Sequence, residues 1–127
     1  MIGDEARVVS AFCAFLEENA WEVQQELDFV DVAATRAGIT LLAEAKGRTS
    51  SPGLDVDTLY GQLLRRIPGS AVGVALLAVV VPDVAIKFAL RVSAEVRRAL
   101  GIHVYSVDQA GTVTHIGEYP DPITGTP

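Results

Sequence analysis

The chain has 127 residues, half of them apolar, and a formal net charge of −6 at pH 7. This length suits one domain, and the apolar content predicts a packed core rather than a disordered chain. The acidic balance argues against a general coat of positive charge for nucleic-acid binding, but it is compatible with carboxylates that hold a cation. No apolar run suits a membrane-spanning helix, and the N-terminus lacks the basic start of a signal peptide. The single cysteine excludes an internal disulfide and favours a cytoplasmic protein.

The first part of the chain predicts one helix and then three strands. The helix runs from Asp4, a helix-capping residue, to about Asn19. Its apolar face is formed by Val8, Val9, Phe12 and Leu16. The strands are expected at residues 20–27, 29–34 and 39–45, with a tight turn at residues 35–38. Three successive strands favour an antiparallel meander.

The second part alternates helices and strands. We expect a loop at 47–54, a helix at 55–67, a buried strand at 72–81, a helix at 82–100 and strands at 102–107 and 112–116. The order αβββαβαββ predicts an α/β domain with a mixed sheet and helices on both faces. We expect one domain over residues 1–117 and a flexible C-terminal tail over residues 118–127.

The segment Leu41–Gly47, "LLAEAKG", ends an apolar strand with two opposite charges. Strand residues alternate between faces, so Glu44 and Lys46 share one face. If the turn's two central residues are Ala37 and Gly38, Asp31 falls opposite Glu44; if they are Arg36 and Ala37, Asp31 falls opposite Leu42. Both registers place Asp31 on the face of Glu44 and Lys46, whereas a three-residue loop with a bulge would not.

Two facing carboxylates repel unless a cation lies between them. Mg²⁺ prefers a few carboxylates together with waters and phosphate oxygens, and Lys46 beside it could orient a water or stabilise charge on a phosphate. Asp31, Glu44 and Lys46 are therefore the groups that phosphodiester hydrolysis needs. The alternative is a salt bridge at a strand end in an α/β domain without this activity.

The motif "FVDV … LLAEAKG" resembles that of the PD-(D/E)XK nuclease superfamily, which has the restriction-endonuclease-like fold. The resemblance extends over roughly residues 4–107 and is strongest to small Holliday-junction-resolvase-like proteins and methyl-directed restriction nuclease domains. It implies that Asp31, Glu44 and the Ala45 backbone carbonyl bind Mg²⁺, for which Mn²⁺ can substitute, and that Lys46 is catalytic. The chain departs from the motif at Val30, where many members have proline.

The resemblance also gives meaning to two residues on the predicted helices. Many members carry a metal-site glutamate on the first helix, and Glu5 lies on the face of Val8 and Val9; alternatively, it is an acid favoured by the helix dipole. Many members carry a glutamine on the helix after the lysine, and Gln62 occupies that place; alternatively, it is a solvated helix residue.

The resemblance implies a Mg²⁺-dependent deoxyribonuclease, most simply an endonuclease, whose DNA substrate could be branched or modified. Paired cuts would require a homodimer, because one site cuts one strand. Weaker candidates for nucleic-acid contact are Arg48, Thr49, Ser50, Tyr60 and Arg66. The acidic charge motivates an alternative, which is a catalytically silent protein of this fold that binds nucleic acid or a partner protein. The two histidines are isolated in sequence and are assigned no chemistry.

Overall fold

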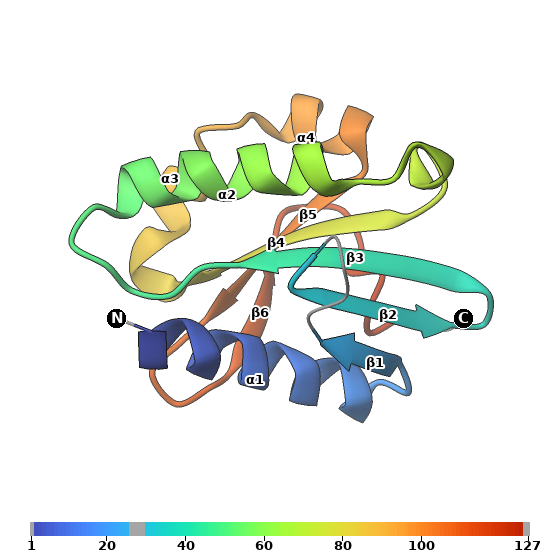
Figure 1. Cartoon of the computed structure of the whole chain (residues 1–127), viewed down its shortest axis with the longest axis horizontal. Helices are drawn as coiled ribbons and strands as arrows, with labels where there is room; N and C mark the ends of the chain where they lie inside the picture. Colours follow the sequence, from blue (N-terminus) through green and yellow to red (C-terminus); the bar gives the residue numbers. More distant parts are fainter. Residues whose placement is uncertain (1, 26–29, 126–127) are drawn as a thin grey trace.

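The computed structural model describes residues 2–25 and 30–125, which build a six-stranded mixed sheet (Figure 1). The strands, adjacent in the order of the sequence, are β1 (Glu22–Gln25), β2 (Val32–Arg36), β3 (Ile39–Ala45), β4 (Leu76–Pro82), β5 (Ile102–Val107) and β6 (Val113–Ile116). Strands β1, β2 and β3 form the predicted antiparallel meander. Strands β3, β4 and β5 are parallel to one another, and β6 is antiparallel to β5.

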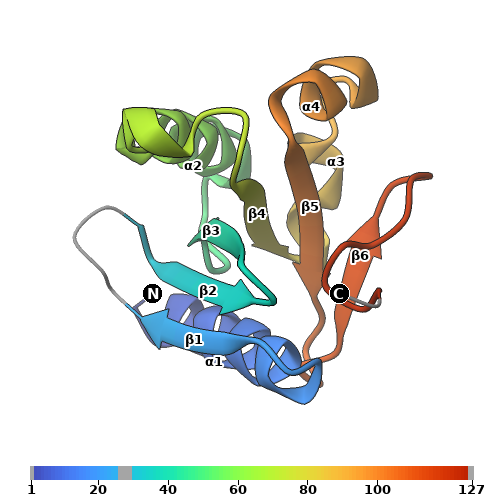
Figure 2. The ribbon, with the colours of Figure 1, turned by 90° about the vertical axis from the view of Figure 1, so that its right-hand side faces the viewer.

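Helices cover both faces of the sheet (Figure 2). Helix α1 (Ile2–Glu18) lies on one face. The other face carries α2 (Pro52–Arg66), α3 (Ile86–Ala89) and α4 (Ala94–Leu100), with short 3-10 turns η1 (Gly69–Ala71) and η2 (Asp83–Ala85). The predicted fold class, a mixed sheet flanked by helices, is therefore confirmed.

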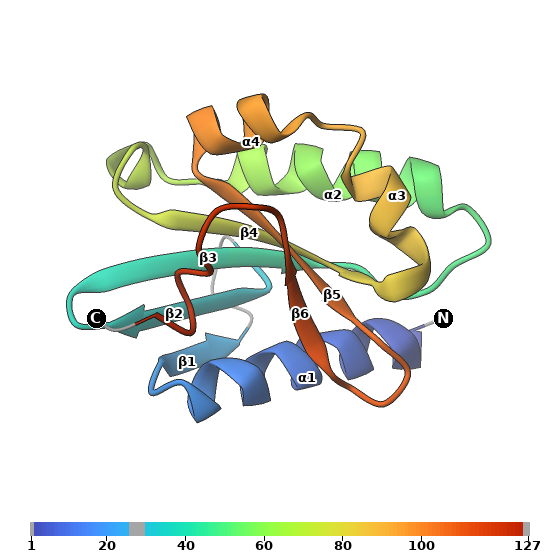
Figure 3. The ribbon, with the colours of Figure 1, turned by 180° about the vertical axis from the view of Figure 1, so that it is seen from behind.

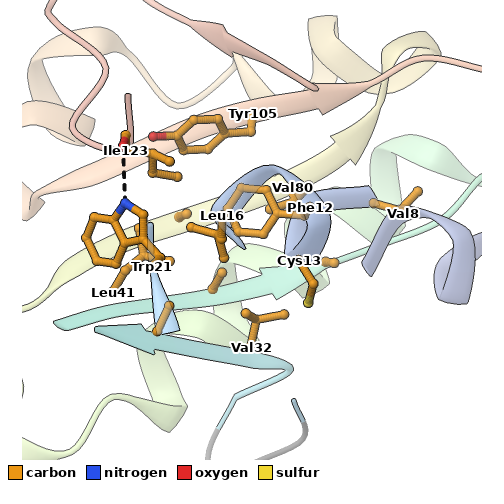
Figure 4. Packing of buried hydrophobic residues seen from close by; sticks show 14 of the residues in the cluster. Val8, Phe12, Cys13, Leu16, Trp21, Val32, Leu41, Val80, Tyr105 and Ile123 are labelled. Carbon is orange, nitrogen blue, oxygen red and sulfur yellow. Dashed lines mark hydrogen bonds between the residues drawn. The ribbon is translucent and has the colours of Figure 1, made fainter. Parts of the chain in front are cut away.

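The period-two alternation of the strands divides the core into two apolar clusters. Leu41 and Ala43 point toward α1, where they join Phe12 and Leu16 (Figure 4). Leu42 points toward α2 and joins the second cluster. Strand β4 contributes to both clusters and is almost wholly buried, as its run of apolar residues predicted.

The prediction of one helix over residues 82–100 is wrong. Helix α3 ends at Ala89, and α4 begins after Ser93, whose hydroxyl accepts a hydrogen bond from the Val96 N–H. This cap gives the backbone an alternative to a continuous helix. The restart changes the helical phase, so Val96 is about half exposed, whereas Arg97 is buried and donates to the Val92 carbonyl.

The C-terminal segment, which was expected to be a flexible tail, makes contacts with the rest of the domain. It passes from β6 across the sheet and ends beside β2 (Figure 3). Ile123 is fully buried, and its carbonyl accepts hydrogen bonds from Trp21 Nε1 at 3.1 Å (Figure 4) and from Arg36 at 2.9 Å. Tyr105 donates its hydroxyl proton to Asp121 at 2.7 Å. Side chains of the core therefore bind a segment that has no helical or strand periodicity of its own.

We predict that Ile123→Ala destabilises the domain by about 2–5 kcal/mol, because it removes a fully buried side chain from the core. Val74→Ala is the control, since Val74 is 77% exposed, and it should change the free energy of unfolding by less than about 0.5 kcal/mol. Urea unfolding of the two variants and the wild type measures both effects. Equal stability of all three proteins would show that the C-terminal segment adds nothing to the fold.

The fold brings together two histidines that are distant in sequence. His103 Nδ1 on β5 lies 3.0 Å from His115 Nε2 on β6, and the ring of Tyr119 packs edge-on against both imidazoles. Burial, and secondarily the charge of His115, lowers the pKa of His103 to about 4. Burial also lowers the pKa of His115. Asp121 opposes both shifts and Arg97 reinforces them, so the folded state favours the neutral pair.

This pair should make the fold sensitive to acid. The folded pKa of His103 lies below its ordinary value of 6.5, so the unfolded chain binds more protons between pH 6.5 and about 4. The free energy of unfolding should therefore fall as the pH falls through this window. The variant with both His103→Gln and His115→Gln should show a shallower fall when unfolding is measured at several pH values. An unchanged slope would refute a role for the pair.

Candidate functional site

The turn between β2 and β3 fixes the register of the candidate site. Ala37 and Gly38 have φ values of +51° and +80°, which are typical of the central pair of a two-residue hairpin turn. Arg36 consequently pairs with Ile39, and Val32 pairs with Ala43. The first of the two predicted registers is therefore the one adopted, and it brings Asp31 beside Glu44.

Asp31 and Glu44 are held near each other by two hydrogen bonds, each from a backbone N–H to a carboxylate. The Asp31 N–H donates to Glu44 Oε2 at 2.6 Å. In return, Asp31 Oδ2 accepts from the Ala45 N–H at 2.9 Å. The two carboxylates thus lie at the end of β3 in one hydrogen-bonded unit. The strand periodicity predicted that Asp31 and Glu44 share one face, and one of the two registers left open placed them opposite each other.

Glu44 is a fully buried carboxylate at the end of a core strand. Burial raises its pKa, and the nearby charge of Asp31 adds to the rise. The Asp31 N–H and the guanidinium of Arg66 act in the opposite direction. Arg66 Nη1, at the last residue of α2, lies 2.6 Å from Glu44 Oε1. The site therefore already contains a cation, supplied by a residue that the sequence predicted only as a weak nucleic-acid contact.

Lys46 connects the end of β3 to helix α1. Its N–H donates to the Val80 carbonyl at 3.0 Å, which continues the parallel ladder for one residue beyond the strand. Its Nζ lies 3.8 Å from Glu5 Oε1, and the Lys46 and Glu5 side chains are 25% and 43% exposed. Glu5 therefore contacts Lys46, while its part in a metal site stays a prediction.

Gly47 allows the first turn of α1 to approach the site. A Cβ atom at Gly47 would lie 2.4 Å from the Glu5 nitrogen and 2.8 Å from its Cα. The next residue, Arg48, donates its N–H to the Asp4 carboxylate, and this bond is the main cause of the lowered pKa of Asp4. The glycine after the lysine is therefore required where the loop packs against the helix.

The other predicted site residues lie in different environments. Gln62 is half-buried on α2, one turn before Arg66 on the same side of the helix. Tyr60 is buried, donates its hydroxyl proton to the Ala89 carbonyl at 2.7 Å and has a pKa raised by burial to about 12, so it is placed as a packing residue. Thr49 donates to Asp55, while Arg48 and Ser50 are exposed.

The donor set suits a hard divalent cation in part. Asp31 and Glu44 provide two carboxylates at one point, and Mg²⁺ commonly binds one or two carboxylates with waters and substrate oxygens. Within residues 2–25 and 30–125, however, no three side chains of His, Cys, Asp and Glu form a group able to hold a metal. Glu5 instead pairs with Lys46. Within the described residues, protein side chains alone thus do not form a complete coordination shell for a divalent ion.

Comparison with solved structures supports the fold. The structure of an XisH family protein from Nostoc punctiforme aligns with a TM-score of 0.57 at 19% sequence identity, over 87% of this chain and 99% of that one. This likeness concerns the fold alone, and it agrees with the restriction-endonuclease-like α/β fold that the motif predicted. No protein-family profile and no curated protein matches the chain. Over its described residues, the chain has no helix long and apolar enough to cross a membrane.

We predict that Gly47→Ala destabilises the domain by about 1–3 kcal/mol, because the added methyl group would overlap the backbone of Glu5. Gly61→Ala is the matched control. Gly61 is exposed in α2 with open space around its Cα, so the alanine should stabilise the helix by about 0.5–1 kcal/mol. Opposite shifts in the free energy of unfolding are expected, and a stabilising effect of Gly47→Ala would contradict the packing argument.

Proposed function

We propose that this protein is a divalent-metal-dependent nuclease that hydrolyses phosphodiester bonds in DNA. The observation that carries the proposal is the pairing of Asp31 with Glu44 at the end of β3, where the next charged residue is Lys46. Glu44 is a fully buried carboxylate at the end of a core strand, and the charge of Asp31 raises its pKa, so a cation near it would be favoured. A divalent cation supplies positive charge and the chemistry of phosphate cleavage together.

In this proposal Asp31, Glu44 and the Ala45 carbonyl would hold Mg²⁺ or Mn²⁺. When bound, the ion would polarise a phosphate oxygen and stabilise the charge of the transition state. The Lys46 ammonium would orient the attacking water or bind an oxygen of the scissile phosphate. Glu5 keeps that ammonium near the end of β3, where Lys46 Nζ lies 3.8 Å from Glu5 Oε1. Gln62, on the half-buried flank of α2, would contact the DNA strand.

A second function is favoured by one specific observation. Arg66 already neutralises Glu44, as a metal would, which is what a catalytically silent member of the fold would require. Such a protein would bind nucleic acid or a protein partner without cleaving anything. Binding of Mn²⁺ that depends on Asp31 and Glu44 distinguishes the nuclease from the silent protein.

We expect purified protein with Mg²⁺ or Mn²⁺ to cleave at least one of linear, branched and single-stranded DNA. Lys46→Ala should lower the cleavage rate by about a hundredfold or more, because it removes a charged group from the reacting phosphate. Lys87, on α3, is the only other lysine in the chain, so Lys87→Ala is a matched control and should retain the activity.

The proposal fails if no DNA substrate is cleaved, or if Lys46→Ala and Lys87→Ala cleave equally well. Asp31→Asn provides a further comparison, since it should abolish Mn²⁺ binding in calorimetry while the carboxamide oxygen can still accept the Ala45 N–H. Gel-filtration of the protein with and without DNA would show whether a homodimer forms on the substrate.

A further inference from the structure

Arg66 is placed where a cation would have to enter the site. Its Nη1 contacts Glu44 Oε1, while the other oxygen of Glu44 accepts the Asp31 N–H. Glu44 is fully buried, whereas the Arg66 side chain is 40% exposed. The guanidinium therefore lies between Oε1 and the solvent. An ion that approaches this oxygen from the solvent side meets the arginine first.

The negative charge of Asp31 and Glu44 can be balanced by Arg66 or by a divalent ion, but not by both at the same oxygen. Asp31 and Glu44 carry two negative charges when ionised, and Arg66 supplies one positive charge by direct contact. A divalent ion on the same carboxylate would bring two further positive charges against the guanidinium. Like charges at contact distance repel strongly where water is largely excluded, so both cations cannot occupy Oε1.

We propose that Arg66 and the divalent metal exchange on Glu44, so that the arginine is the counter-ion of the metal-free site and is released when metal binds. This inference rests on the proposed metal site. Release costs little conformational strain, because the arginine is the last residue of α2 and is already part exposed. The freed guanidinium then lies on the flank of Gln62, where its planar donors suit a phosphate of the DNA strand.

The test is the affinity for Mn²⁺ alone, measured by titration calorimetry in mildly alkaline buffer without DNA. Arg66→Gln should bind Mn²⁺ about tenfold more tightly than the wild type, because the ion no longer has to displace a paired cation. Arg65→Gln is the matched control, since it removes the same charge from the neighbouring, exposed residue of α2 and should leave the affinity unchanged. Structural damage alone would weaken binding, so a gain in affinity is specific to the exchange.

The outcomes separate the exchange from the proposed function. Equal or weaker Mn²⁺ binding by Arg66→Gln, with a wild-type protein that binds Mn²⁺ through Asp31, would overturn the exchange and leave the metal site standing. Binding by Arg66→Gln but not by the wild type would overturn the exchange, because the metal would then not release the arginine, and it would argue for the silent protein. If Arg66→Gln does not fold, Arg66→Lys replaces it. This variant keeps one charge with a shorter reach, and it should bind Mn²⁺ more tightly than the wild type; unchanged affinity would count against the exchange.

Discussion

The burial of the Glu44 carboxylate is the constraint on which the site depends. A carboxylate that is fully removed from water at the end of a core strand is unstable unless other groups compensate for its lost hydration. Two groups do so, and they come from different parts of the chain: the Asp31 N–H before β2 and the Arg66 guanidinium at the end of α2. The β2–β3 turn fixes the register that places the Asp31 N–H beside Glu44. The length of α2 places the Arg66 guanidinium there.

A second constraint joins the two faces of the sheet at this point. Glu44 lies on the α2 side, whereas Glu5 belongs to α1 on the opposite side. The chain connects them through Gly47, whose missing side chain lets the loop after β3 touch the first turn of α1. The hydrogen bond from Arg48 to Asp4 secures this contact. Lys46 is consequently held between a carboxylate of α1 and the end of β3, and a change in the position of α1 would move the ammonium.

The features that local sequence determines were predictable. The alternation of β3 and the apolar run of β4 are set by neighbouring residues, so the meander followed from the sequence. The sequence also placed Asp31 on the face of Glu44, but it left two turn registers open. The features that distant contacts determine were not. Ile123 in the C-terminal segment is bound by Trp21 and Arg36, which lie 102 and 87 residues away, and no periodic pattern reveals such bonds. The ion pair of Arg66 with Glu44 depends likewise on how α2 crosses the sheet, and the break before α4 depends on one serine cap.

The distribution of positive charge bears on the proposed function, because a protein that binds DNA needs cations that the fold has not already used. Several arginines are committed to the fold, since Arg7, Arg36 and Arg97 donate to backbone carbonyls of distant or neighbouring segments. Arg66 is paired with Glu44, and Lys46, which follows β3, is paired with Glu5. In a chain of net charge −6, so few free cations give little attraction for a polyanion. In the proposed function, a bound divalent ion would make the local charge near Glu44 more positive in two ways, by its own charge and by the release of Arg66. Affinity for the DNA backbone would then arise at the site of cleavage and depend on the metal.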